Sequence, residues 1–282
     1  MTICVAVKVH DCLVLAADSA TSLVGVDAVG NPAIVNVYAH GNKVFNLVKG
    51  LPVAAMTCGM GNIGTYSVSS IAKDLRRELS ADAAHGGIDR YGYTVEAITA
   101  RAKELLYDRH YLELKDPPAG DHTLEFFVGG YSAGSATAEL WKIVIANGAC
   151  LGVEQQMPDD DAFVIWSGQP EALNRLLMGF SGQLAEALLE AGVEEERLSP
   201  LFELIKSHTA TALVEPAMPT GDAIALADFL VDVTKRYVHF RHGADTVGGE
   251  TDIATVTRHE GFKWIRRKHF YPRELNLETD HV

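Results

Sequence analysis

The chain opens with two short apolar runs that a polar pair separates. Residues 2–9 (TICVAVKV) and 12–17 (CLVLAA) are rich in β-branched and aliphatic side chains, and His10 and Asp11 lie between them. This pattern predicts an antiparallel hairpin with a two-residue loop. In that register the numbers of paired residues sum to 21, so Asp18, at the end of the second strand, arrives beside the first residues of the chain.

The spacing of apolar residues changes after the hairpin. Residues 19–42 contain glycine and proline without a sustained period, which predicts an irregular excursion. From residue 62 the apolar residues recur every three or four positions, which is the helical period, and short apolar runs return after residue 122. Further strands are predicted at 34–38, 43–48, 52–58, 123–130, 138–145, 162–166, 252–257 and 261–266. Helices are predicted at 62–80, 93–112, 170–191, 197–213 and 221–238.

The order of these elements indicates the fold class. Strands, two helices, strands, two or three helices and final strands do not alternate regularly, as parallel βαβ units do. The order favours an α+β fold in which two sheets are sandwiched between helical layers. Because the chain has no internal repeat, low-complexity segment or linker rich in Pro, Gly or Ser, residues 1–282 are expected to form a single domain.

Composition and charge restrict the partners and the compartment. With 48% hydrophobic and 22% charged residues, the chain resembles an ordinary soluble protein. A net charge of −13 argues against nucleic-acid binding, which draws its affinity from clustered cations. No apolar run approaches the length of about 20 residues that a membrane-spanning helix needs, and no secretory signal opens the chain, so we expect a cytoplasmic protein without a membrane partner. Four cysteines without C-x-x-C spacing indicate reduced thiols.

One basic cluster interrupts this acidic balance near the C-terminus. It comprises Lys263, Arg266, Arg267, Lys268 and His269. A solvated terminal face is the favoured interpretation, and a patch for an anionic ligand is the alternative.

Thr2 combines a hydroxyl group with a position directly after the initiator methionine. A threonine hydroxyl is a weak nucleophile that needs a neighbouring base, and a free α-amino group with a pKa of about 7.7 to 8 can supply one. Met1 must be removed before that amine exists, and the small side chain of Thr2 is compatible with such processing. By itself, a threonine here is more typical of a β-branched residue that starts a strand.

Two segments resemble the proteasome β subunits, which are N-terminal nucleophile (Ntn) hydrolases. Residues 2–18 (TICVAVKVHDCLVLAAD) resemble the opening of these subunits, where a terminal threonine begins a strand and the second strand ends in an apolar-Ala-Asp sequence. Residues 41–45 (GNKVF) resemble the segment that carries the active-site lysine, which implies this role for Lys43, with Asp18 as its partner. The charge of Lys43 would lower the pKa of the nucleophile and of the terminal amine.

The resemblance extends to three further residues. Residues 53–61 (VAAMTCGMG) resemble the strand that runs into a glycine turn, which implies that the N–H of Gly59 faces the developing oxyanion. Residues 165–168 (IWSG) resemble the family's Ser-Gly turn and imply a supporting role for Ser167, which the capping of a following helix would also explain. The family's last acidic residue corresponds to Asp245 only after a shift of one position.

The resemblance implies a four-layer αββα sandwich and a threonine-type peptidase acting on peptides or unfolded chains. It also implies a self-compartmentalised homo-oligomer, such as a ring, with no cofactor and no metal, and it leaves a partner ATPase undetermined. The length of the chain is nearer to the longer bacterial proteasome homologues such as Anbu, with a helical insertion near 197–220 and a short C-terminal extension.

Other interpretations remain open at this level. Residues 59–64 satisfy G-x-G-x-x-G, but no second parallel strand ending in an acid follows, so a dinucleotide site is disfavoured. His239 and His242 lack the helical Glu of a zincin motif and favour a solvated or core-edge pair. A small-molecule amidase on the same fold is one functional alternative. An inactive structural subunit that keeps Met1 is another.

Overall fold

A computed structural model describes residues 2–26, 31–82, 85–116, 118 and 122–268. Met1 and most of the expected C-terminal extension lie outside the described residues, as does His269 of the basic cluster. The fold is α+β, and every strand pair in the described part of the chain is antiparallel.

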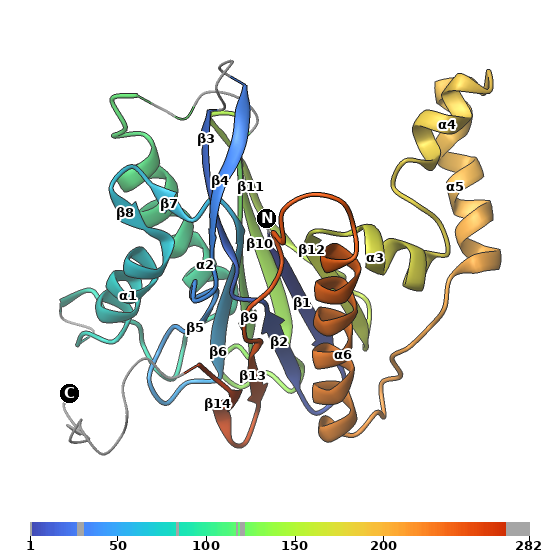
Figure 1. Ribbon diagram of the computed structural model, residues 1–282. Helices are drawn as coiled ribbons and strands as arrows, with labels where there is room; N and C mark the ends of the chain where they lie inside the picture. The colour runs from blue at the N-terminus through green and yellow to red at the C-terminus, as the bar shows by residue number, and fades with distance from the viewer. Residues whose placement is uncertain (1, 27–30, 83–84, 117, 119–121, 269–282) are drawn as a thin grey trace.

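Two five-stranded sheets form the centre of the molecule (Figure 1). The first sheet has the order β12 (Phe163–Gly168), β1 (Ile3–Lys8), β2 (Leu13–Ala17), β13 (Asp252–Thr257) and β14 (Gly261–Arg266). The second has the order β11 (Ala149–Gln155), β10 (Glu139–Ala146), β9 (Thr123–Gly130), β6 (Val53–Gly59) and β5 (Val44–Asn46). Two small hairpins, β3 (Thr21–Val26) with β4 (Pro32–Tyr38) and β7 (Asn62–Ile63) with β8 (Tyr66–Ser67), lie outside these sheets.

The helices fall into two groups along the chain. The first group comprises α1 (Val68–Leu79) and α2 (Val95–Lys103), which continues into the π-helical segment η2 (Glu104–Tyr111). The second comprises α3 (Glu171–Leu173) with the π-helical segment η3 (Asn174–Met178), α4 (Leu184–Glu190), α5 (Glu195–Thr209) and α6 (Thr220–His239).

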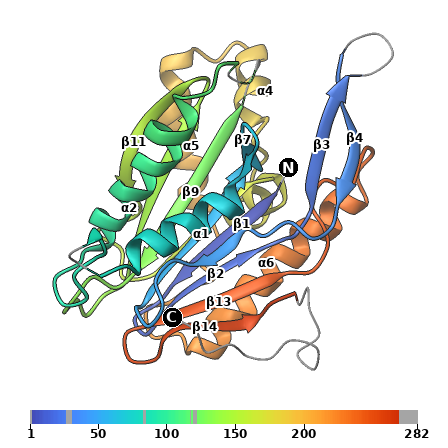
Figure 2. The ribbon, with the colours of Figure 1, turned by 90° about the vertical axis from the view of Figure 1, so that its left-hand side faces the viewer.

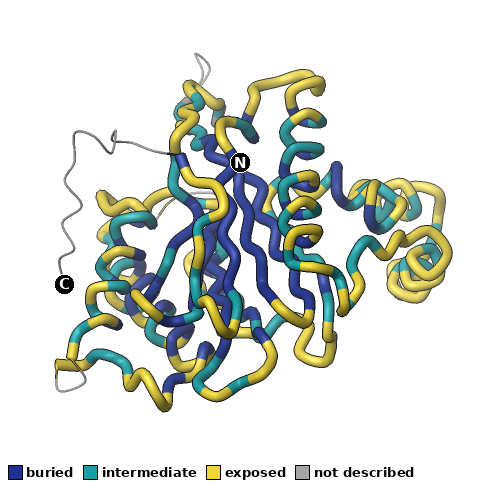
Figure 3. Tube along the Cα trace, turned by 90° about the horizontal axis from the view of Figure 1, so that it is seen from below, coloured by how far each residue is buried: buried dark blue, intermediate teal, exposed yellow. Residues whose placement is uncertain are grey.

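Three buried clusters explain why the central strands are apolar on both faces. Along β1, Ile3, Val5 and Val7 pack in a cluster with α6, whereas Cys4 and Ala6 belong to a cluster shared with the second sheet. A third cluster joins the other face of the second sheet to α1 and α2. A strand covered on both faces gains hydrophobic stabilisation from every residue, so the polar alternation of a one-sided strand is lost. Figure 3 shows these strands as the buried centre of the molecule.

The predicted register of the first hairpin is confirmed. Cys4 pairs with Ala17 and Lys8 pairs with Leu13, so the paired numbers sum to 21. Asp18 consequently lies opposite Ile3, and its backbone N–H donates to the carbonyl of Ile3 at 3.2 Å. An acidic side chain is thereby brought beside the start of the chain.

Several predicted boundaries are wrong. Residues 19–42 contain the β3–β4 hairpin, and β11 was not predicted. The helix predicted at 170–191 is interrupted because Gly179 adopts a left-handed conformation, with φ of 85°, which ends the helical segment. The helix predicted from residue 62 begins only at Val68, after the β7–β8 hairpin.

Helices α4 and α5 lie to one side of the sheets (Figure 1), and α5 overlaps the segment near 197–220 in which an insertion was expected. Neither helix has a buried residue, and they contact one another. Because α4 and α5 bury no residue, the other helices provide the packing against the sheets.

Among the described residues no helix is both long and apolar enough to cross a membrane.

Candidate functional site

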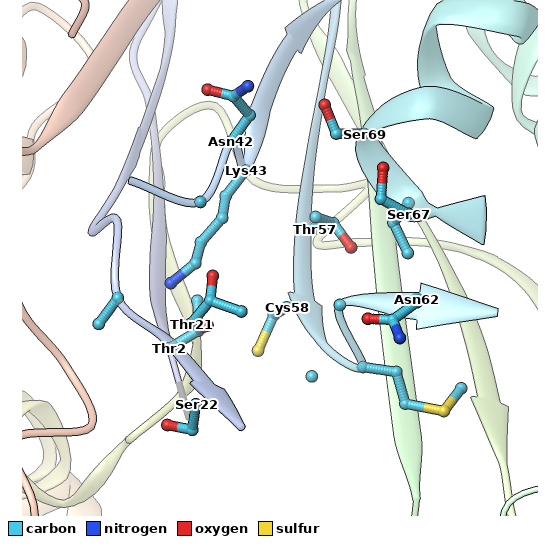
Figure 4. Close-up of a pocket in the computed structure, with 16 residues that line it drawn as sticks. Thr2, Thr21, Ser22, Asn42, Lys43, Thr57, Cys58, Asn62, Ser67 and Ser69 are labelled. Carbon is cyan, nitrogen blue, oxygen red and sulfur yellow. The ribbon is translucent and has the colours of Figure 1, made fainter. Parts of the chain in front are cut away.

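A cleft with a volume of about 270 Å³ brings together segments from both sheets, and we call it the Thr2 cleft. One wall carries Thr2 and the start of β3, and the opposite wall carries the end of β6 and the first turn of α1 (Figure 4). The segment before β5 supplies Lys43, whose side chain extends toward the wall that carries Thr2. The cleft therefore contains three of the residues singled out in the sequence, Thr2, Lys43 and Gly59.

Asp18 lies directly behind the cleft and is fully buried. Its Oδ1 accepts hydrogen bonds from Lys43 Nζ at 2.6 Å and from the N–H of Ile3 at 3.1 Å. Its Oδ2 accepts from the N–H groups of Ala20 and Gly248, both at 3.0 Å. Four donors hold the carboxylate, and the carboxylate holds the ammonium group of Lys43, which is itself 6% exposed. The ammonium group of Lys43 therefore keeps one position, because any other position would leave a buried charge without its counter-charge.

Thr2 is fixed through its main chain. Its carbonyl oxygen accepts a hydrogen bond from the N–H of Gln169 at 2.8 Å. Gly168 approaches the same carbonyl so closely that an added Cβ would lie 1.9 Å from the oxygen, and its φ is +106°. Only glycine satisfies both conditions without strain. The turn after β12 therefore positions Thr2, which is 4% exposed.

Gly59 ends β6 at the rim of the Thr2 cleft. The N–H of Thr57 donates to Lys43 O on the β5 side, whereas the N–H of Met60 donates to Thr123 O on the β9 side. Since N–H directions alternate along a strand, the N–H of Gly59 faces the same side as that of Thr57. The pairing of β5 with β6 ends at Val44 and Met56, and Gly59 lines the Thr2 cleft beyond that end.

We expect Gly59→Ala to lower the free energy of unfolding by about 2 to 4 kcal/mol. The φ of Gly59 is +92°, and an added Cβ would lie 2.0 Å from Thr123 O, which belongs to a paired strand and cannot easily shift. Gly148 provides the matched control because its φ is +88° and its added Cβ would meet open space. Urea unfolding of Gly148→Ala should show a loss of only about 1 kcal/mol. Equal losses would contradict the steric explanation.

Ser167 lies behind the cleft wall and pairs with Cys4 in the β1–β12 ladder. Its hydroxyl donates to the carboxylate of Glu125, and its Oγ is 3.6 Å from Cys58 Sγ. Cys58 lines the Thr2 cleft, whereas Ser167 does not. The partner of Ser167 is therefore a carboxylate from the second sheet, which the sequence did not indicate.

Burial raises the pKa of the Cys58 thiol to about 11, although the contact with Ser167 acts in the opposite direction. The thiolate is the reactive form, so alkylation of Cys58 should be negligible at pH 7 and should rise toward pH 11. Half-exposed Cys150 should react first. Mass spectrometry of peptides after iodoacetamide treatment between pH 7 and pH 10 checks this order. Rapid labelling of Cys58 at pH 7 would contradict it.

Asp245 does not line the Thr2 cleft. Its Oδ2 lies 2.9 Å from His239 Nδ1, and both side chains are more than half exposed. Gly248, three residues later, is the one that reaches Asp18 through its N–H. The described residues contain no group of three or more His, Cys, Asp or Glu side chains that could hold a metal ion.

A second buried ion pair was missed by sequence reasoning. Lys268 Nζ donates to Asp252 Oδ2 at 2.5 Å and to Ser19 Oγ at 2.7 Å, and Lys268 is 4% exposed. Ser19 directly follows Asp18, and its hydroxyl donates to the carbonyl of Glu250. The end of the first sheet is thus tied to the segment that carries Asp18. Nothing in the sequence indicated the buried pair of Lys268 and Asp252, because Lys268 belongs to a basic cluster and a charged residue is usually solvated.

The glycine-rich turn at 59–64 leads into the β7–β8 hairpin and not directly into a helix. β6 pairs with antiparallel neighbours on both sides, whereas a dinucleotide-binding turn follows a parallel strand. The dinucleotide alternative therefore lacks its structural context. Comparison of the chain with models of known protein families and with curated proteins found no match.

Proposed function

We propose that this protein is a threonine-type peptidase of the Ntn-hydrolase class, with Thr2 as its nucleophile after removal of Met1. The observation that carries the proposal is the buried pair of Lys43 and Asp18, 2.6 Å apart, in contact with the cleft that Thr2 lines. A buried ion pair is costly to desolvate and adds little to stability, so its place at a cleft favours a chemical role.

The reaction begins when Thr2 Oγ1 attacks the carbonyl carbon of a peptide bond. The free α-amino group of Thr2 accepts the hydroxyl proton and then gives it to the leaving amine, so that an acyl ester on Thr2 and a free amine product result. Water then attacks the ester, and the carboxylic acid product leaves while Oγ1 regains a proton. No metal or cofactor enters this balance.

Lys43 and Gly59 have separate roles in the proposal. The positive charge of Lys43 favours the neutral form of the α-amine, which is the form that can accept a proton. The N–H of Gly59 stabilises the negative oxygen of the tetrahedral intermediate, and such a donor contributes about 3 to 4 kcal/mol. Asp18 is a positioning residue because it reaches the reaction only through Lys43.

The fold and assembly expected for this class are part of the proposal. Two antiparallel sheets share a buried cluster, and helices cover their other faces, which supports the four-layer αββα sandwich of Ntn hydrolases. In proteasome-like members of this class the active sites face an internal chamber of a homo-oligomer, and we propose the same arrangement here, which would restrict access to peptides and unfolded chains.

The decisive test is the intact mass of the purified protein before and after treatment with a threonine-directed β-lactone or epoxyketone. The proposal predicts a mass without Met1, a single covalent adduct, and tandem mass spectra that place the adduct on Thr2. Thr2→Ser is expected to form the adduct, whereas Thr2→Ala is not. A protein that retains Met1 and forms no adduct would be the inactive subunit, and the proposal would fail.

A further inference from the structure

A second cavity adjoins the Thr2 cleft, and cationic side chains gather at it. Its volume is about 70 Å³, roughly that of two water molecules, which suits a carboxylate group. Asn42 and Ser69 line both spaces, and Figure 4 shows them across from one another at the end of the Thr2 cleft opposite Ser22. The small cavity is therefore an extension of the cleft and not a separate surface feature.

Three cations line this extension. Lys73 and Arg76 come from α1, and Arg267 follows β14 (Figure 2). The guanidinium group of Arg267 stacks on Trp264, with its central carbon 4.9 Å from the ring centroid. This contact restricts the Arg267 side chain at the edge of the cavity before any ligand binds. Arg267 would therefore lose less rotamer entropy on binding than an unrestricted arginine would.

These cations lack carboxylate partners in the part of the chain that the structure describes. Their neighbours do have such partners, since Arg77 pairs with Asp74 and Arg266 pairs with Asp228. Burial and the nearby charge of Arg267 lower the pKa of the Arg76 guanidinium. In a protein with a net charge of −13, mutually repelling cations that have no carboxylate partner among the described residues indicate a site for an external anion.

Among the described residues that line the extension, Asp252 is the single acidic one, and its carboxylate is already occupied. Asp252 Oδ2 accepts from Lys268 Nζ, and Asp252 Oδ1 accepts from the N–H of Lys268 at 3.1 Å. The cavity therefore retains a positive charge.

We infer that this extension is a specificity pocket for an acidic side chain of the peptide bound in the Thr2 cleft, with Arg76 and Arg267 as its principal ligands. The inference rests on the proposed peptidase function. Arginine suits the task because its planar guanidinium donates paired hydrogen bonds to a carboxylate. Among the described residues of the basic cluster, Arg267 is the one that lines this cavity, whereas Arg266 and Lys268 are paired elsewhere.

The test uses matched fluorogenic peptides in which Glu or Gln occupies each position on either side of the cleaved bond in turn. At one position, kcat/KM should be about tenfold higher for the Glu peptide than for the Gln peptide. The ratio should shrink between about 50 mM and about 500 mM salt, because a partly exposed ion pair is screened. A ratio near one at every position would overturn the inference.

The variants Arg76→Gln and Arg267→Gln, alone and together, assign the preference to this cavity. Each is expected to lower the Glu-to-Gln ratio, and the double variant should bring it close to one. Arg77→Gln is the matched control because Arg77 also lies on α1 but its side chain is 80% exposed and pairs with Asp74. An equal effect of Arg77→Gln would show that net charge, and not the cavity, sets the preference.

Binding measurements separate this inference from the proposed function. Fluorescence anisotropy with Thr2→Ala protein and the same labelled peptides reports affinity without cleavage. If no peptide is cleaved but the Glu peptide still binds more tightly and Arg76→Gln abolishes the difference, the pocket stands and the peptidase function fails. If peptides are cleaved without any preference for Glu over Gln, the peptidase function stands and the acidic specificity pocket fails.

Discussion

Thr2→Ala is expected to lower kcat for every cleaved peptide by at least about 10⁴-fold, because removal of a covalent nucleophile leaves only binding and oxyanion stabilisation. Thr2→Ser should retain part of the activity, since its hydroxyl can occupy the same position. The measurement is the initial rate of hydrolysis of a fluorogenic peptide panel at saturating substrate.

The control for this prediction is the fold of the variant. Thr2 is held by its carbonyl group, which the substitution keeps, so the thermal midpoint of Thr2→Ala should lie within a few degrees of that of the unmodified protein. An inactive variant with an unchanged midpoint supports a chemical role. Full activity of Thr2→Ala would remove Thr2 from the mechanism altogether.

Lys43→Met is expected to abolish detectable hydrolysis and to lower the free energy of unfolding by about 3 to 5 kcal/mol, because it leaves the carboxylate of Asp18 buried without its counter-charge. Asp18→Asn should have an effect of similar size. Asn cannot satisfy all four donors that now converge on the carboxylate, and the ammonium group of Lys43 loses its partner.

The double variant Asp18→Asn/Lys43→Met separates stability from catalysis. It removes both charges, so its loss of stability should be smaller than the sum of the single losses, while hydrolysis stays absent. Urea unfolding and the peptide assay provide the two readouts. The exposed pair of Arg236 and Asp232 serves as the control, and its disruption should change the free energy of unfolding by less than about 1 kcal/mol. If the loss of stability in the double variant equalled the sum of the two single losses, Asp18 and Lys43 would not be energetically coupled.

The sequence predicted the centre of the fold better than its periphery. The register of the first hairpin was predictable because both strands are apolar except at Lys8 and a polar pair marks the loop. Strand β11 was missed because it lies at the edge of its sheet, where half-exposed residues weaken the apolar pattern. The excursion at 19–42 hid the β3–β4 hairpin because exposed strands that pack on little else need no regular alternation.

The candidate site was predictable where local geometry determines it. The hairpin register alone placed Asp18 beside the start of the chain, and the resemblance supplied Lys43 and Gly59. The contacts of Ser167 with Glu125 and of Lys268 with Asp252 join residues more than 15 positions apart, and no local pattern encodes such pairings. The extension of the Thr2 cleft likewise forms because α1 and the end of β14 lie side by side, and only the tertiary fold determines this arrangement.

The anchoring of Thr2 through its carbonyl has a consequence for how the proposed peptidase would mature. The hydrogen bond from Gln169 and the close approach of Gly168 both act on the C-terminal side of the Thr2 Cα, and β1 begins one residue later. A processing step at the preceding peptide bond would break none of these contacts. Removal of Met1 would then free the α-amine without a conformational change, in contrast to a zymogen that is activated by rearrangement. The contacts that hold Thr2 would already be in place before the amine is released.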